Sequence, residues 1–143
     1  TVGLGVALHT PRPVVVVDGD GSALMRLGSL ATVGAHAPGN LVHLVLDNGV
    51  HDSTGGQRTL SSAVDLPAVA AACGYRTVHA CASLDDLSAA LAAALAADGP
   101  SLVHLRIRPG SLDGLGRPRV TPAEVARRFR EFVVTAAPVG AAR

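Results

Sequence analysis

The chain has 143 residues, of which 48% are hydrophobic and 16% are charged, and its formal net charge is +1. This length suits a single domain, and the apolar fraction is sufficient for a core and too high for a disordered chain. Lysine is absent, so the chain offers no Schiff-base lysine for pyridoxal phosphate and no P-loop lysine. There is no basic run either, which argues against a nucleic-acid-binding surface.

The cysteines and the first residues bear on the compartment. Cys73 and Cys81 fit neither a metal-ligand spacing nor a disulfide framework, which is typical of a cytoplasmic protein. Residues 1–8 are apolar, but they lack a basic region and are too short to span a bilayer. We therefore expect a cytoplasmic protein with no signal peptide and no membrane anchor.

Strand-like and helical segments alternate along the chain. Four short apolar runs are predicted strands: residues 14–17, 41–46, 77–80 and 102–107. The first is a run of valines, which indicates a strand buried on both faces. Helices are predicted at residues 22–36, 67–73 and 83–97 and after Thr121. Residues 47–62 are predicted to form a polar loop.

Capping residues and glycines add detail to the predicted helices. Asp65, Ser83 and Thr121 are expected to cap the second, third and last helix at their N-termini. Gly28 and Gly34 each weaken the first helix by roughly 1 kcal/mol relative to alanine. Such glycines indicate close packing against a neighbouring element.

The order of these elements predicts an α/β fold, with a parallel sheet flanked by helices on both faces. We expect a single domain over residues 1–135 and a flexible tail over residues 136–143. His43 and His104 lie inside apolar strands, and we expect them to be hydrogen-bonded core residues.

Polar residues follow two of the predicted strands. The first strand leads into Asp18-Gly19-Asp20-Gly21-Ser22, and the second leads into Asp47-Asn48-Gly49. In parallel sheets, ligands bind beyond the carboxyl ends of the strands. Glycines allow the backbone to approach a ligand closely, and the free N–H groups at the start of the next helix favour a phosphate.

Asp20 adds a negative charge to this expected phosphate site. A carboxylate repels a phosphate unless a cation lies between them, so Asp20 predicts a bridging divalent ion. Asn48 could add an amide oxygen, and oxygen ligands of this kind are typical of Mg²⁺. The alternative is that Asp20 only caps the helix in an ordinary Asp-Gly turn.

The motif Gly19-Asp20-Gly21-Ser22, followed by Asn48 28 residues after Asp20, resembles the diphosphate-binding motif of thiamine diphosphate enzymes. Residues 17–34, 40–49 and 51–57 are similar to the subgroup that contains the phosphonopyruvate and sulfopyruvate decarboxylases. Residues 115–118 and Thr121-Pro122 also resemble this subgroup. The similarity covers most of the chain.

The resemblance implies a thiamine diphosphate-binding fold in which residues 1–135 form the diphosphate-binding, or PP-type, domain. The Mg²⁺ ligands that it implies are Asp20, Asn48 and the main-chain carbonyl of Val50. The residues implied to hold the diphosphate are Gly19, Gly21, Ser22 and Gly49. Asp47 stands where the wider superfamily usually has asparagine, and it could instead reach the metal.

The loop after the metal ligands is expected to face the substrate. His51 could act in proton transfer, or it could be an exposed loop histidine. The other candidate substrate residues are Asp52, Ser53, Thr54 and Gln57. Ser53 and Thr54 could equally form local side-chain turns, and Arg58 could meet a phosphonate.

Thiamine diphosphate enzymes also use a second domain, which binds the aminopyrimidine and supplies an activating glutamate. The glutamates of this chain, Glu124 and Glu131, lie in the last predicted helix, and neither is assigned that role. The resemblance thus implies the C-terminal portion of a larger enzyme, incomplete at its N-terminus and inactive without a pyrimidine-binding domain. That domain would belong to the same chain or to a partner subunit, in a homo- or hetero-oligomer.

The reaction implied is decarboxylation of a small 2-oxoacid that uses thiamine diphosphate and Mg²⁺. Phosphonopyruvate is the expected substrate, giving phosphonoacetaldehyde and CO₂ in phosphonate biosynthesis. Two alternatives stay open: a sulfopyruvate decarboxylase β-type subunit, and a non-catalytic α/β binding module.

Overall fold

The computed structural model describes residues 1–110, 114, 116 and 118–135. The expected tail at residues 136–143 lies outside the described residues, as do parts of the late motif at 115–118. The chain forms two compact units, Thr1–Gly110 and Ser111–Arg143.

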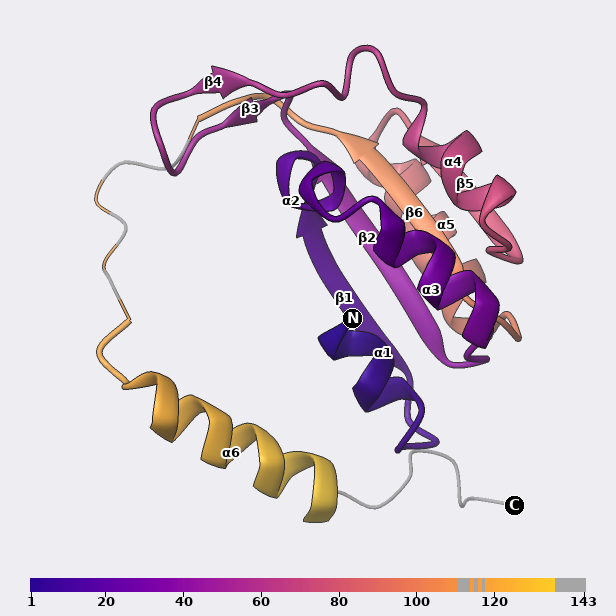
Figure 1. Ribbon diagram of the computed structural model, residues 1–143, viewed down its shortest axis with the longest axis vertical. Coiled ribbons are helices and arrows are strands. Elements are labelled where there is room, and N and C mark those ends of the chain that lie inside the picture. Colours follow the sequence, from indigo (N-terminus) through magenta and orange to yellow (C-terminus); the bar gives the residue numbers. More distant parts are fainter. Residues whose placement is uncertain (111–113, 115, 117, 136–143) are drawn as a thin grey trace. The chain divides into compact units, whose positions relative to one another are not determined.

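A four-stranded parallel sheet forms the centre of the first unit. Its strands lie in the order β1 (Val14–Gly19), β2 (Leu41–Asp47), β6 (Ser101–Arg106) and β5 (Thr77–Cys81) (Figure 1). The predicted parallel sheet is thereby confirmed. Because β1 and β2 are neighbours, the polar turns that follow them leave the same edge of the sheet.

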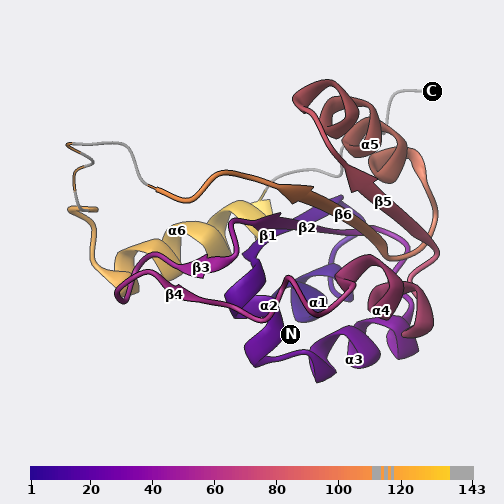
Figure 2. The ribbon, with the colours of Figure 1, turned by 90° about the horizontal axis from the view of Figure 1, so that it is seen from above.

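Helices cover both faces of this sheet, as the alternating pattern predicts (Figure 2). On one face, α1 (Val2–Ala7), α3 (Gly28–His36) and α4 (Leu66–Ala72) pack against apolar side chains of β2 and β6 in one hydrophobic cluster. On the other face, α5 (Leu84–Ala96) packs on β5 and β6 and forms a second cluster.

Side chains cap two of these helices where the sequence predicts it. Asp65 accepts a hydrogen bond from the Ala68 N–H (3.0 Å) at the start of α4. Ser83 accepts one from the Asp86 N–H (3.1 Å) at the start of α5. Such caps satisfy N–H groups that have no partner within the helix.

Three predictions about local structure are wrong. The single helix expected over residues 22–36 is two helices, α2 (Asp20–Met25) and α3, because the backbone of Arg26 leaves the helical region at φ −129° and ψ 41°. The loop 47–62 contains a short antiparallel hairpin of β3 (Val50–His51) and β4 (Gln57–Arg58).

The third concerns β1, which is half-buried on one face and exposed on the other. Val15 is 45% exposed and Val17 is 63% exposed. Within the first unit, the helix on that side of the sheet, α5, packs on β5 and β6. An apolar run predicts a strand in the interior of a protein, but it does not show whether a helix covers one face of the strand or both.

The described part of the second unit contains α6 (Pro122–Thr135). Thr121 and Glu124 form the expected capping box: the Thr121 Oγ1 accepts from the Glu124 N–H (3.3 Å), and the Glu124 carboxylate accepts from the Thr121 N–H (2.7 Å). The hydrogen bonds that the Thr121 N–H and the Thr121 hydroxyl (2.8 Å) donate to the Glu124 carboxylate lower the pKa of Glu124. Among the described residues, no helix is long and apolar enough to cross a membrane.

Gly34 provides a test of the packing between α3 and α4. A Cβ at this position would lie 1.7 Å from the Cys73 carbonyl oxygen, whereas a Cβ at Gly28 would meet nothing within 4 Å. We expect Gly34→Ala to lower the free energy of unfolding by about 1–3 kcal/mol, since backbone must move. Gly28→Ala, the matched control, should leave stability unchanged or raise it by about 0.4–1 kcal/mol. Urea denaturation measures both, and equal effects would contradict this packing.

Candidate functional site

The turns that follow β1 and β2 meet at the edge of the sheet. Gly19 pairs with Leu46 in the parallel register, so Asp20 and Asn48 leave neighbouring strands at nearly the same level. The Asn48 N–H donates a hydrogen bond to Asp20 Oδ1 (3.3 Å). The structure therefore brings together the two residues that the sequence analysis predicts as side-chain metal ligands, through the Asp20 carboxylate and the main chain of Asn48.

Asp20 is a buried carboxylate, with 1% of its surface exposed. Its second oxygen, Oδ2, accepts a hydrogen bond from the Thr59 hydroxyl. Within the described residues, no arginine or histidine forms an ion pair with Asp20. A buried negative charge without a cation is unfavourable, so a metal ion beside Asp20 would stabilise it.

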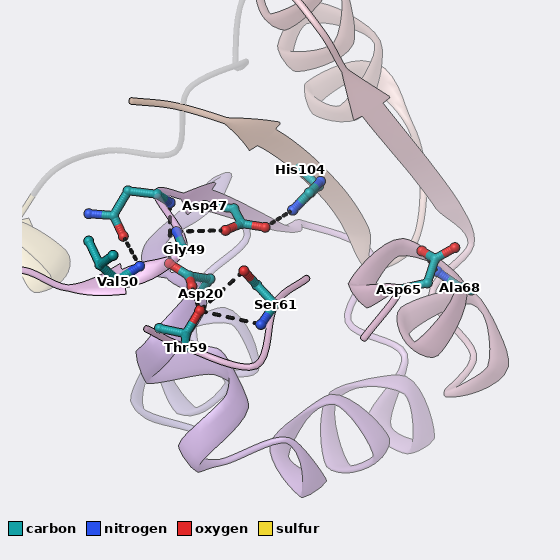
Figure 3. Close-up of polar contacts among 10 residues, drawn as sticks. Asp20, Asp47, Gly49, Val50, Thr59, Ser61, Asp65, Ala68 and His104 are labelled. Carbon is teal, nitrogen blue, oxygen red and sulfur yellow. Dashed lines mark hydrogen bonds and ion pairs between the residues drawn. The ribbon is translucent and has the colours of Figure 1, made fainter. Parts of the chain in front are cut away.

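Thr59, which follows β4, donates to Asp20, and Ser61 in turn contacts Thr59; the sequence analysis missed both residues (Figure 3). Thr59 is 7% exposed and Ser61 is 5% exposed. The Ser61 N–H donates to the Thr59 Oγ1 (3.3 Å), and the Thr59 N–H donates to the Gly49 carbonyl (2.9 Å). A buried carboxylate needs hydrogen-bond donors. The hydroxyl-rich segment that follows the Gly-Gly-Gln turn was therefore the sequence signal that could have indicated Thr59 and Ser61.

Hydrogen bonds of the Asn48 side chain, one of them to Asp52, fix the loop from Asn48 to Val50. The Asn48 Oδ1 accepts from the Val50 N–H (3.1 Å), and the Asn48 Nδ2 donates to Asp52 (3.0 Å). Asp52 also accepts from the Gly110 N–H (2.9 Å). Gly49, between Asn48 and Val50, has a φ of +71°, a conformation that glycine adopts without strain.

Asp47, the last residue of β2, has partners for both side-chain oxygens. Its Oδ1 accepts from the Gly49 N–H (3.1 Å), and its Oδ2 lies 3.0 Å from His104 Nε2 (Figure 3). His104 and Asp47 are both buried. The expectation that His104 is a hydrogen-bonded core residue fits this contact.

His51 lies over the start of α2. A Cβ on Gly21 would come within 2.5 Å of His51 Cε1, so glycine is needed there for the ring to approach. The structure thus places His51, the candidate catalytic residue, against one of the glycines predicted to hold the diphosphate. Ser22, the next residue of α2, is exposed at the surface.

The remaining candidate residues lie on an exposed turn between β3 and β4. The Thr54 hydroxyl donates to Gln57 Oε1 (3.3 Å), and Gln57 Nε2 donates to the Thr54 carbonyl (3.4 Å). These bonds fit the alternative in which Thr54 forms a local turn. Ser53 and Arg58 are exposed beside them.

A second polar cluster lies on the face of the sheet that α1, α3 and α4 cover. His43 Nδ1 is 3.3 Å from the Tyr75 hydroxyl, and His43 Nε2 is 3.5 Å from Asp18 Oδ2 without forming a hydrogen bond. Burial lowers the pKa of His43 and raises that of Tyr75. Asp18, His43 and Ser22 line a cavity of about 400 Å³.

No group of three or more His, Cys, Asp or Glu side chains in the described ranges is arranged to hold a metal ion. The groups in contact with Asp20 are instead the Asn48 N–H and the Thr59 hydroxyl oxygen, and Asn48 also carries an amide oxygen. Such neutral oxygen donors, together with one carboxylate, suit Mg²⁺.

Thr59→Val tests whether the hydroxyl of Thr59 holds Asp20. Valine keeps the shape of the side chain but leaves one oxygen of a buried carboxylate without a donor, so the free energy of unfolding should fall by about 1–3 kcal/mol. Thr59→Ser retains the hydroxyl and should keep most of that stability. Denaturant titrations compare the two variants without added metal, and equal losses would show that the hydroxyl does not matter.

Comparison with protein families places the chain among cofactor-dependent enzymes. The model of the thiamine pyrophosphate enzyme, C-terminal TPP binding domain, matches residues 1–105. A solved structure of a putative thiamin diphosphate-dependent enzyme from Mycobacterium smegmatis has a TM-score of 0.61 and 31% identity, and the match covers 76% of this chain and 20% of that one.

Two named relatives extend this result. A phosphonopyruvate decarboxylase of Streptomyces viridochromogenes is 92% identical over 135 residues, which are 94% of this chain and 34% of that protein. The sulfopyruvate decarboxylase subunit beta of Methanothermobacter thermautotrophicus is 45% identical over 113 residues, which are 79% of this chain and 58% of that subunit. The chain thus spans about a third of the first relative and more than half of the second.

These matches confirm the resemblance that the Gly-Asp-Gly-Ser motif and the spacing to Asn48 indicate. The fold has the parallel sheet with helices on both faces that the resemblance implies, and the two halves of the motif lie together. The chain belongs to the thiamine pyrophosphate enzymes and carries their C-terminal TPP-binding domain.

Proposed function

We propose that this chain is the Mg²⁺- and diphosphate-binding part of a thiamine diphosphate-dependent decarboxylase that acts on phosphonopyruvate. The observation that carries the proposal is the contact of Asp20 with Asn48, in a chain so similar to a phosphonopyruvate decarboxylase. Bound thiamine diphosphate supplies the electron sink for loss of CO₂ from a 2-oxoacid.

The residues present fit a Mg²⁺ ion. Asp20 offers a buried negative charge, which a divalent cation would neutralise. Because Asn48 Nδ2 donates to Asp52, the Asn48 Oδ1 is the atom that would bind the metal ion, with the lone pair that its hydrogen bond from the Val50 N–H leaves over, and the Val50 carbonyl is the proposed third ligand. The Asp47 carboxylate lies against His104 and the Gly49 N–H, whereas Asn48 directly contacts Asp20, which supports Asn48 over Asp47 as the second side-chain ligand.

The diphosphate is assigned to the turns on either side of this metal site. Gly19, Gly21 and Ser22 lie at the start of α2, and Gly49 lies in the opposite loop. The packing of His51 on Gly21 supports a place for His51 close to the cofactor. Because Asp20 would repel the diphosphate, the metal ion between them is an essential part of this assignment.

The substrate is assigned to the exposed turn after His51. Ser53, Thr54 and Gln57 offer hydroxyl and amide groups there, and Arg58 offers a charge suited to a phosphonate. Asp52 was also a candidate for substrate contact, but its bonds to Asn48 and Gly110 favour a role in orienting the metal loop.

The activating glutamate comes from a pyrimidine-binding domain outside these residues. The relatives support either arrangement, since one named protein is about three times as long as this match and another is a subunit beta. We propose that the active enzyme is an oligomer in which such a domain, on the same polypeptide or on a partner, faces the site of this chain.

A sulfopyruvate decarboxylase β-type subunit is the second candidate. The similarity to the named subunit beta of the methanogen favours it. Both candidates use the same metal and diphosphate residues, so substrate preference is the property that separates them. A binding module without catalysis would show no dependence on either cofactor.

Decarboxylation by the full-length enzyme tests the proposal. CO₂ release is measured from phosphonopyruvate, sulfopyruvate and pyruvate, with and without thiamine diphosphate and Mg²⁺. We expect phosphonopyruvate to give the highest kcat/KM and activity to require both cofactors. Faster turnover of sulfopyruvate would favour the second candidate, and turnover without cofactors would overturn the mechanism.

Asp20→Asn tests the role of the metal ligand in the same assay. Loss of the carboxylate charge should reduce kcat/KM by at least about 100-fold, since changes even to groups that support metal ligands cost 10–100-fold. Asp98→Asn is the matched control: its carboxylate is 86% exposed and pairs with Arg76 at 3.2 Å, so activity should not change. Full activity of Asp20→Asn would contradict the assignment.

A further inference from the structure

His104 lies in β6, one of the two central strands of the sheet, and has no part in the proposed function. We propose that His104 is a positioning residue for the metal site: through Asp47 it fixes the loop that carries Asn48 and Val50. This inference rests on the proposed function, because it takes that loop to be the one that binds Mg²⁺.

The contact between His104 and Asp47 is buried and direct. His104 is 8% exposed, Asp47 is 5% exposed, and the Nε2 and Oδ2 atoms are 3.0 Å apart. In the register of β2 and β6, His104 lies opposite Val45, two residues before Asp47. The two side chains therefore share one face of the sheet as diagonal neighbours, and the sheet itself holds them in contact.

Asp47 connects its contact with His104 to the loop of Asn48 and Val50. Its Oδ1 accepts from the Gly49 N–H (3.1 Å), and its main-chain carbonyl accepts from the Ile107 N–H (2.8 Å). The orientation of the Asp47 carboxylate thus sets the position of the Gly49 peptide. The Gly49 peptide in turn lies between Asn48 and Val50, the residues with the proposed ligand oxygens.

Without His104, the restraint on Asp47 is lost. One oxygen of a buried carboxylate would lack a partner, which favours rotation of that group toward another donor or toward the cation itself. Rotation would break the bond to Gly49 and release the loop. His104 therefore supports the proposed metal ligands without touching the metal. Residues in such positions affect metal affinity.

Binding of thiamine diphosphate to the full-length enzyme tests this role. Isothermal titration calorimetry over a series of Mg²⁺ concentrations gives the Mg²⁺ concentration for half-maximal binding. His104→Leu removes the donor, whereas His104→Gln keeps an N–H that can reach Asp47. Ser101→Ala is the matched control, because Ser101 is fully buried on the same strand and bonds Thr77 (2.7 Å) away from the site.

We expect His104→Leu to raise the half-maximal Mg²⁺ concentration about 10-fold or more, in the range for groups that support metal ligands. His104→Gln should restore most of the affinity. Ser101→Ala should lower the melting temperature but leave the Mg²⁺ requirement unchanged. At saturating Mg²⁺ and thiamine diphosphate, kcat of His104→Leu should stay within about two-fold of the wild type, because the change acts on metal binding.

An unchanged Mg²⁺ requirement in His104→Leu would overturn the inference, and so would an equal rise in Ser101→Ala, which would indicate general destabilisation. If His104→Leu does not fold, His104→Asn, whose side chain is too short to reach Asp47, is held to the same expectation. Wild-type binding that does not depend on Mg²⁺ would instead overturn the proposed function, and this inference with it.

Discussion

The site depends on a negative charge buried at the junction of two strands. Asp20 is almost inaccessible to water, and its partners are an N–H group and a hydroxyl, neither of which carries a positive charge. Burying an ionised carboxylate is unfavourable unless a cation compensates for it. Two hydrogen bonds reduce this cost, and a divalent ion that also attracts the diphosphate would remove most of it. One residue thereby links the stability of the fold to cofactor binding.

The topology of the sheet supplies the rest of the geometry. Parallel pairing of β1 with β2 brings Asp20 beside Asn48, although 28 residues separate them in the sequence. Pairing of β2 with β6 then places His104 against Asp47, directly before the loop. The hairpin of β3 and β4 returns the chain so that Thr59 reaches the second oxygen of Asp20. Three neighbouring parts of the first unit, namely β2, β6 and the hairpin, thus each restrain either the Asp20 carboxylate or the loop that follows β2.

Local signals in the sequence were sufficient for the four strands of the parallel sheet, the caps and the motif, but not for the hairpin strands β3 and β4. Each capping side chain accepts a hydrogen bond from an N–H group three residues further along the chain, so residues close in sequence determine the cap. This holds for Asp65, Ser83 and Thr121. Features set by contacts distant in sequence were not predictable in this way. The break at Arg26 and the exposed face of β1 are such features, and so is the bond from Thr59 to Asp20, which joins residues 39 apart. Gly34 was foreseen as a close contact, but Gly28, which has the same sequence signal, makes none.

The most direct test of the account is to locate the metal ion in the full-length enzyme. Crystals grown with thiamine diphosphate and Mn²⁺ in place of Mg²⁺ would show the ion by its anomalous scattering. The account predicts one peak bound by Asp20, the Asn48 amide oxygen and the Val50 carbonyl, at roughly the 2.0–2.1 Å expected for Mg²⁺ or slightly longer. A peak bound by Asp47 in place of Asn48, or no ion beside Asp20 when the cofactor is present, would contradict it.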